Sequence, residues 1–214
     1  MTTPEQSDHG LYLDLLRHGE PVGGRRYRGG IDDPLSERGW KQMRNAMKRV
    51  HGHQVVWTSP LSRCRDFAQA LAEERSLACR VEPAFEEIGF GEWEGRTARE
   101  LSETEAEAQR RFWADPIHCT PPGAEPLPAF RERVADGLRR LREAHDGQHV
   151  LVVGHGGLIR VLMLEALRLP LEAFTRIQVP YASISRLRLD PDPEVSPILM
   201  FHNGPAYVDG SSGP

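Results

Sequence analysis

The amino-acid sequence predicts an α/β domain. Short runs of β-branched and aliphatic residues recur between longer segments whose apolar residues have helical spacing. The chain has 214 residues, of which 39% are hydrophobic, so it is long enough to bury a substantial core. We therefore expect a single domain over residues 1–214.

Five apolar runs predict the strands of the sheet. Each run is short, rich in Val, Ile and Leu, and bounded by polar residues, glycine or proline. The two runs that precede a histidine are almost continuously apolar, as buried strands are. The five runs cover residues 11–16, 54–59, 150–154, 183–189 and 198–202.

Segments between these strands predict helices. Trp40, Met43 and Met47 recur at spacings of three and four, so a helix that begins near Ser36, its expected N-cap, packs one face inward. Further helices are expected at about 61–72, 127–141 and 156–167. The last of these is apolar nearly all round and should be buried.

Residues 92–128 interrupt this alternation. The segment contains polar helical patches, Trp93 and Trp113, and it ends in a proline-rich stretch. We expect it to be an excursion from the sheet that acts as a lid, and we call it the lid segment.

Charge, hydropathy and cysteine content exclude several classes of protein. The 27 basic and 31 acidic residues are mixed along the chain, so no basic stripe indicates nucleic acid. No stretch is long and apolar enough to span a bilayer, and the first ten residues lack the order of a signal peptide. Cys64, Cys79 and Cys119 are irregularly spaced and are interpreted as reduced thiols. We expect a soluble cytoplasmic protein.

Two histidines directly follow two predicted strands. The strand at 11–16 is followed by Arg17, His18 and a glycine, and the strand at 150–154 by His155 and two glycines. Ligands of α/β sheets gather outside the carboxyl ends of strands, at the turns into helices. Glycines permit close approach to a ligand, and the helix after His155 would direct unpaired amides to the same place. The pair therefore predicts a site for a small anion.

A third strand end adds an arginine. Arg63 falls in the first turn of the helix that follows residues 54–59, and Pro60 suits the start of that helix. Its guanidinium can bind phosphate oxygens in a bidentate way, as that of Arg17 can. The alternative for Arg63 is a surface salt bridge with Asp66.

The same chemistry needs an acid. Chemistry on a bound anion would need one carboxyl group that burial holds protonated near pH 7, so that it can give a proton to a leaving oxygen. Glu86, Glu87, Glu92 and Glu94 are all candidates, and their pattern does not select one.

Five sequence motifs resemble those of the histidine phosphatase superfamily, also called phosphoglycerate mutase-like, in the same order. They are LLRHGEP (15–21), DDPLSERG (32–39), TSPLSRC (58–64), EIGFGEWEGRT (87–97) and VVGHGGLIRVLM (152–163). The resemblance implies a three-layer α/β/α sandwich with a mostly parallel central sheet. It places the core at about 11–203 and a helical lid at about 92–128.

The resemblance also implies a catalytic role for five residues. In that family the first histidine attacks a phosphomonoester and becomes phosphorylated, and water then releases phosphate; His18 matches it. Arg17 and Arg63 would hold the phosphoryl group, and His155 would contact it and carry a proton there. Glu87 occupies the position of the proton donor.

Substrate binding would use Arg17, Arg63 and His155 together with Gly156 and Arg28. Arg28 stands where the family has a glutamine, and Pro21 and Gly24 replace a usual threonine and asparagine. Phosphate binding is still expected, whereas the detailed substrate contacts differ.

Within the superfamily, further stretches resemble bacterial α-ribazole phosphatases, which act late in cobalamin nucleotide-loop assembly. These stretches include GEWEGRTARELSE (91–103), RFWADP (111–116) and PPGAEP (121–126). We expect a metal-independent phosphatase without cofactor that acts on a small-molecule phosphomonoester such as α-ribazole 5′-phosphate. Neither nucleic acid nor membrane is an expected partner, and a homodimer is left open.

Other functions remain as alternatives. The chain could be a broad-specificity phosphatase, a phosphoglycerate mutase-like enzyme or a non-catalytic phosphate-binding module. His18, His155 and a carboxylate could also bind iron or zinc. The positive charges of Arg17 and Arg63 argue against a cation site, so no metal is expected.

Overall fold

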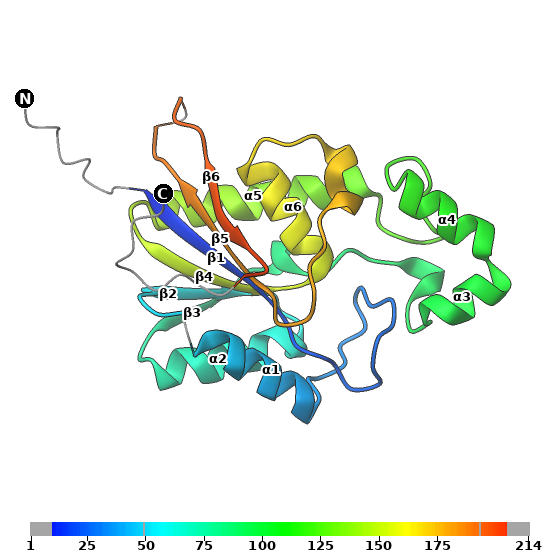
Figure 1. The fold of residues 1–214 in the computed structure, drawn as a ribbon, viewed down its shortest axis with the longest axis horizontal. Coiled ribbons are helices and arrows are strands. Elements are labelled where there is room, and N and C mark those ends of the chain that lie inside the picture. The colour runs from blue at the N-terminus through cyan, green and yellow to red at the C-terminus, as the bar shows by residue number, and fades with distance from the viewer. Residues whose placement is uncertain (1–9, 49, 193, 205–214) are drawn as a thin grey trace, which may run out of the picture.

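A central six-stranded sheet organises the chain in the computed structural model, which describes residues 10–48, 50–192 and 194–204. The first nine and last ten residues of the expected domain lie outside this description. The strand order is β3-β2-β4-β1-β5-β6 (Figure 1). Strands β3, β2, β4 and β1 are parallel, and β5 and β6 are antiparallel to them. This confirms the mostly parallel sheet.

The helices and strands follow the predicted order. The strands are β1 (Leu11–Arg17), β2 (Val55–Thr58), β3 (Ala78–Val81), β4 (His149–Gly154), β5 (Ile184–Leu189) and β6 (Ile198–His202). The α-helices are α1 (Glu37–Met47), α2 (Ser62–Glu74), α3 (Ala98–Thr104), α4 (Ala106–Ala114), α5 (Leu127–Ala144) and α6 (Gly156–Ala166). Short 3₁₀ turns cover η1 (Pro83–Phe85), η2 (Gly91–Trp93) and η3 (Leu171–Arg176).

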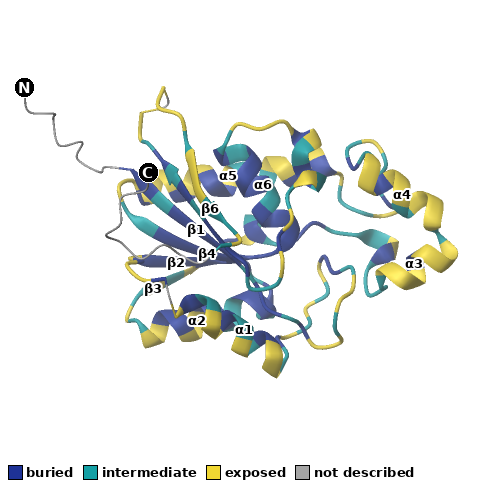
Figure 2. Cartoon of the chain, in the orientation of Figure 1, coloured by how far each residue is buried: buried dark blue, intermediate teal, exposed yellow. Residues whose placement is uncertain are grey.

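Helices cover both faces of the sheet, so the fold has the expected three layers. Helices α5 and α6 lie on one face, and α1 and α2 on the other (Figure 1). Successive side chains of a strand point to opposite faces. Leu13 and Leu15 of β1 accordingly pack with α5 and α6, whereas Leu16 packs with α1 and α2. Figure 2 shows the buried residues concentrated along these strands and the inner helix faces.

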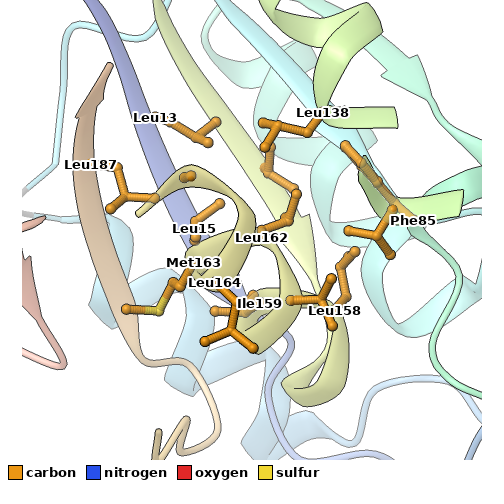
Figure 3. Close-up of a cluster of buried hydrophobic side chains, with 14 of the residues drawn as sticks. Leu13, Leu15, Phe85, Leu138, Leu158, Ile159, Leu162, Met163, Leu164 and Leu187 are labelled. Carbon is orange, nitrogen blue, oxygen red and sulfur yellow. The ribbon is translucent and has the colours of Figure 1, made fainter. Parts of the chain in front are cut away.

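Helix α6 is the most deeply buried helix among those described. Nine of its eleven residues are buried, and its mainly aliphatic side chains pack against β1, β5 and α5. Figure 3 shows Leu158, Ile159 and Leu162 of α6 within the cluster that also contains Leu13 and Phe85. The predicted buried helix at 156–167 is therefore confirmed, and its N-terminus is firmly placed.

Glycine packing fixes helix α1 against the end of β1. The hydroxyl of Ser36 accepts a hydrogen bond from the Gly39 amide at 3.0 Å, which confirms the predicted N-cap. A Cβ atom added at Gly19 would lie 2.3 Å from the Gly39 carbonyl oxygen. Backbone packing against α1 therefore requires glycine at position 19. The approach of a ligand to Gly19 stays a prediction.

Strand β3 was not predicted. Three of its four residues are exposed and it contains an arginine, so Ala78–Val81 lacks the apolar signal of the other strands. Its pairing with β2 at the sheet edge, rather than its own composition, makes it a strand. Pro60 also differs from expectation, because it precedes the N-cap Leu61 instead of occupying the first turn of α2.

The lid segment forms two short helices beyond the sheet. Helices α3 and α4 protrude from the sandwich in Figure 1. Leu101 of α3 and Phe112 of α4 form a small buried apolar cluster with Trp93 of η2. Thr97 and Glu100 form a capping box that begins α3. Within the described residues, no helix combines the length and apolar character needed to cross a membrane.

A buried polar cluster lies on the α1 and α2 side of the sheet. Both oxygens of the Asp14 carboxylate accept hydrogen bonds from Arg186, at 2.8 and 3.0 Å, and one oxygen also contacts His53 and His149. Burial raises the pKa of Asp14, but the hydrogen bonds from His149, His53 and Arg186 outweigh burial and hold that pKa well below its usual range. The fold therefore favours the charged carboxylate.

We expect Asp14→Asn to reduce the free energy of unfolding by about 3 kcal/mol at pH 7, because it removes one partner of a buried ion pair. Chemical denaturation measures this loss. Asp136 supplies the control, because it forms an exposed ion pair with Arg139. Asp136→Asn should change the free energy of unfolding by less than about 0.5 kcal/mol. The native carboxylate contributes stability above the ordinary Asp pKa of about 3.9 and loses it as pH falls towards the lowered pKa. The difference in free energy of unfolding between wild type and Asp14→Asn should therefore become smaller in acid. A difference that stays constant as the pH falls would contradict this account.

Candidate active site

Five of the seven predicted site residues line one pocket at the carboxyl ends of the parallel strands. They are Arg17, His18, Arg28, Glu87 and Gly156. Arg63 and His155 are almost fully buried beneath them, and the His155 ring lies edge-on to the His18 ring with 5.2 Å between ring centroids. Residues far apart in the sequence are thus brought together as predicted.

The backbone fixes the tautomer of His18. Its Nδ1 atom lies 2.7 Å from the carbonyl oxygen of Gly19. Because a carbonyl oxygen only accepts hydrogen bonds, Nδ1 must carry the proton. The other ring nitrogen, Nε2, then keeps its lone pair, which is the form that a nucleophilic imidazole requires.

Both site histidines are held neutral. Burial lowers the pKa of His18 well below its usual value, and the charges of Arg17 and Arg63 lower it further. Burial and the Arg63 charge act in the same way on the pKa of His155. The protonated His155 implied by the resemblance is therefore disfavoured by the protein alone. A phosphoryl dianion beside the ring would act in the opposite direction and favour its proton.

Two arginines are fixed by backbone carbonyls. Arg17 donates to the Val179 oxygen at 2.5 Å, and its guanidinium lies 4.3 Å from the centre of the Tyr181 ring. Arg63 donates to the oxygens of Ile31 at 2.7 Å and Gly29 at 3.1 Å, so it does not form the alternative surface salt bridge with Asp66. The buried Nε atoms of both arginines have no hydrogen-bond partner among the described residues. Each guanidinium therefore keeps donor capacity for an anion.

Glu87 is held at the N-terminus of α6. Its Oε2 atom accepts a hydrogen bond from the Gly157 amide at 3.0 Å, and Oε1 accepts from the Leu158 and Ile88 amides at 3.1 Å each. Arg133 of α5 donates to the Glu87 carbonyl oxygen at 3.0 Å and fixes its backbone. Of the candidate glutamates, Glu87 is the one that is buried and lines the pocket.

Glycines allow this close packing. A Cβ atom at Gly157 would lie 2.5 Å from Glu87 Oε1, so no larger residue leaves the carboxylate in place. A Cβ atom at Gly156 would lie 3.4 Å from the Arg17 guanidinium. The turn from β4 into α6 therefore keeps Glu87 and Arg17 beside the histidines.

Arg28 is buried in the wall of the pocket, but its nitrogens are engaged. Its Nε atom pairs with Asp33 at 2.6 Å, and its terminal nitrogens donate to the oxygens of Gly24 at 2.7 Å and Val22 at 2.8 Å. It thereby holds together residues 23–30, which we call the arginine loop. Its contact with a substrate stays a prediction.

Sequence reasoning missed several residues of the pocket, among them Arg160 and Tyr181. Arg160 of α6 lines it, and its spacing of four from Gly156 could have indicated a shared helix face. Tyr181 lies against Arg17 and has its ring centroid 5.5 Å from that of His18. It comes from the connection between η3 and β5, where no local sequence pattern signals a site.

A possible metal-ligand group lies elsewhere. Among the described residues, the side chains close enough to share an ion are Asp14, His53 and His149. His149 begins β4, whereas His155 follows its other end. Arg186 already pairs with both Asp14 oxygens, and its positive charge opposes a cation there. The alternative site made of His18, His155 and a carboxylate does not occur as such a group within the described ranges.

Known proteins resemble the chain in sequence and in fold. Residues 13–196 match the family model of the histidine phosphatase superfamily (branch 1). The adenosylcobalamin/α-ribazole phosphatase of Escherichia coli is 32% identical over 79% of this chain and 85% of its own length. Phosphoserine phosphatase 1 of Hydrogenobacter thermophilus is 34% identical over 83% of this chain and 86% of its own.

A solved structure shows the same architecture. The crystal structure of the α-ribazole phosphatase from Shigella flexneri superposes with a TM-score of 0.79 at 29% identity, covering 94% of this chain and all of that one. The family match extends over most of the chain and includes both strand-end histidines, both arginines and Glu87. The chain therefore belongs to the histidine phosphatase superfamily.

Proposed function

We propose that this phosphatase cleaves phosphomonoesters through a phosphohistidine formed on His18. The observation that carries the proposal is the tautomer of His18, whose Nδ1 proton is bound by the Gly19 carbonyl. This leaves Nε2 as a neutral nucleophile beside Arg17 and Arg63. Fixed positive charges at a buried site stabilise the charge that develops on the phosphoryl oxygens.

In the first step His18 Nε2 forms a bond to phosphorus. The bond from phosphorus to the ester oxygen breaks, and the leaving oxygen takes a proton from Glu87. Three amides occupy lone pairs of the Glu87 carboxyl group, two on Oε1 and one on Oε2. A carboxyl oxygen has two lone-pair sites, so Oε2 is the oxygen with room for that proton.

In the second step water attacks phosphorus. Its proton passes to Glu87 Oε2, the bond from nitrogen to phosphorus breaks, and its electron pair returns to His18. The burial of His18 and His155 supports this chemistry, because electrostatic interactions are stronger away from bulk water. No step uses a metal ion, and we propose metal-independent activity.

We propose α-ribazole 5′-phosphate as the first candidate substrate. The E. coli relative named for this activity and the S. flexneri structure support this choice. The aromatic residues of the pocket, including Tyr27 and Trp113, would suit the flat base of such a leaving group.

A second candidate is a small phosphomonoester that carries an acidic group. The H. thermophilus relative named phosphoserine phosphatase supports this class. A specific observation also favours it, because the pocket lining contains five arginines and one acidic residue.

The expected compartment and assembly are likewise proposals. The three cysteines are all free thiols in the structure, which supports a reducing compartment such as the cytoplasm. A homodimer stays a prediction that sedimentation can test.

The proposed function predicts that His18→Ala abolishes hydrolysis of an aryl phosphate, α-ribazole 5′-phosphate and 3-phosphoglycerate in metal-free buffer. Rapid acid-free quenching of the wild type with labelled substrate should trap phosphate on His18, which mass spectrometry can locate. Full activity of His18→Ala would overturn the proposal. Activity that chelators remove and one metal restores would replace it with a metal mechanism. Tight binding without turnover would indicate the non-catalytic module.

We expect the His18 ring to stay neutral, with its proton on Nδ1, down to pH 6. Burial, Arg17 and Arg63 lower its pKa, so the nucleophilic form persists below the usual histidine value of about 6.5. Nuclear magnetic resonance of the ring nitrogens, assigned by comparison with His18→Asn, gives the tautomer and the midpoint. A midpoint at or above 6.5, or a proton on Nε2, contradicts this description.

Gly157→Ala should lower kcat by about a hundredfold, because its Cβ atom displaces the Glu87 carboxyl group by a fraction of an ångström or more. Steady-state kinetics with an alkyl phosphate measures the effect. Gly30→Ala is the matched control, since the nearest atom to its Cβ atom among the described residues would be Glu86 Oε1, at 3.7 Å. Equal rates for both variants would show that the position of Glu87 does not limit the reaction.

A further inference from the structure

Arg160 lies on the pocket side of α6, one helical turn beyond the phosphate-binding end. It follows Gly156 by four residues, and both line the pocket. A rise of 1.5 Å per residue places its Cα atom about 6 Å further along the helix axis. It is therefore set to meet the part of a substrate beyond the phosphoryl group.

The Arg160 side chain is held in one orientation. Its Nε atom donates to the Ile177 carbonyl oxygen at 2.8 Å. Its guanidinium carbon lies 5.3 Å from the centre of the Phe174 ring and 5.8 Å from that of Trp113 in the lid segment. Contacts with aromatic rings and one carbonyl fix the planar group while leaving its terminal nitrogens available for a bidentate contact.

The positive charge of Arg160 has no acidic partner in the described part of the chain. Burial lowers the pKa of the Arg160 guanidinium, and the positive charges of Arg17 and Arg25 lower it further. The negative charge of Glu87 acts in the opposite direction and raises this pKa. Arginine remains charged in proteins, so a partly buried guanidinium that is not directly paired with a carboxylate is costly unless an anion joins it.

Arg25 of the arginine loop lies in the same pocket and also lacks a partner among the described residues. The other two arginines of this loop do have partners. Arg26 donates to the oxygens of Gly23 and Gly95, and Arg28 pairs with Asp33. Arg25 is close enough to affect both Arg17 and Arg160 electrostatically. Two unmatched cations thus remain after Arg17 and Arg63 are assigned to the phosphoryl group.

We propose that Arg160 and Arg25 form a second anion subsite, which binds a carboxylate or phosphate group on the leaving side of the substrate. The inference rests on the proposed phosphatase function and narrows its substrate class. It supports the second candidate class, which consists of small phosphomonoesters that carry a further acidic group. A planar guanidinium in a fixed position matches a carboxylate in a bidentate way.

Two substrates isolate the contribution of the second anion. 3-Phosphoglycerate and glycerol 3-phosphate share a three-carbon skeleton and the phosphate ester, and they differ by a carboxylate in place of a hydroxymethyl group. We expect wild type to favour 3-phosphoglycerate in kcat/KM by about ten- to a hundredfold, the range for hydrogen bonds to charged groups. Arg160→Met should remove most of this preference, and Arg25→Met, on an exposed loop, should reduce it.

Control variants separate recognition from structure. Arg110→Met removes an exposed arginine of α4 that pairs with Glu107 outside the pocket, and it should leave the preference intact. Arg160→Lys keeps the charge without the planar fork and should retain part of the preference. Circular dichroism checks that each variant is folded.

The inference is overturned if wild type shows no preference, or if the preference survives both Arg160→Met and Arg25→Met. An equal loss for both substrates in Arg160→Met would also overturn it and assign the residue to holding the lid segment. Turnover of an aryl phosphate that depends on His18 tests the phosphatase function separately. Should no ester be hydrolysed, calorimetric binding of the same two compounds to wild type and Arg160→Met still decides the subsite.

Discussion

The parallel pairing of β1 with β4 is the constraint on which the site depends. Arg17 is in register with Gly154, and the His18 amide donates to the Gly154 oxygen at 2.8 Å. This pairing places the residues that follow the two strands side by side, so the rings of His18 and His155 meet. Loops alone could not hold two imidazoles so closely, because the sheet and the buried helix α6 fix both chain segments.

In the proposed function, the groups that act in the reaction are separate from the groups that select the substrate. Arg17, Arg63 and Glu87 are buried or backbone-bound groups that surround His18, the proposed nucleophile, and each is fixed by main-chain atoms. The groups further out come from the arginine loop, the lid segment and the outer turn of α6. Trp113 joins two of these parts, since its indole nitrogen donates to the Tyr27 hydroxyl at 2.9 Å. Such an arrangement would allow the outer groups to differ between relatives while the inner groups stay the same, and the relatives described above are indeed named for different substrates.

Local sequence patterns predicted much of the fold, because most helices and strands bury a clear apolar face. They missed β3, whose pairing partner determines its structure, and they missed the packing of Gly19 against Gly39, which is distant in sequence. The resemblance selected Glu87 among several glutamates, a choice that composition could not make. Tyr181 and the engagement of Arg28 depend on loop geometry, which no spacing rule describes.

In the proposed reaction, the three amides bound to the Glu87 carboxyl group leave one position for a proton, on Oε2. If Oε2 serves both steps, the departing alcohol and the incoming water must occupy the same place in turn. The competition between them then depends on how long the alcohol stays. A pocket that releases it quickly gives hydrolysis, whereas one that retains a molecule with a second hydroxyl would return the phosphoryl group to it. Residence time in the outer pocket would thus separate a phosphatase from a mutase built on the same nucleophile.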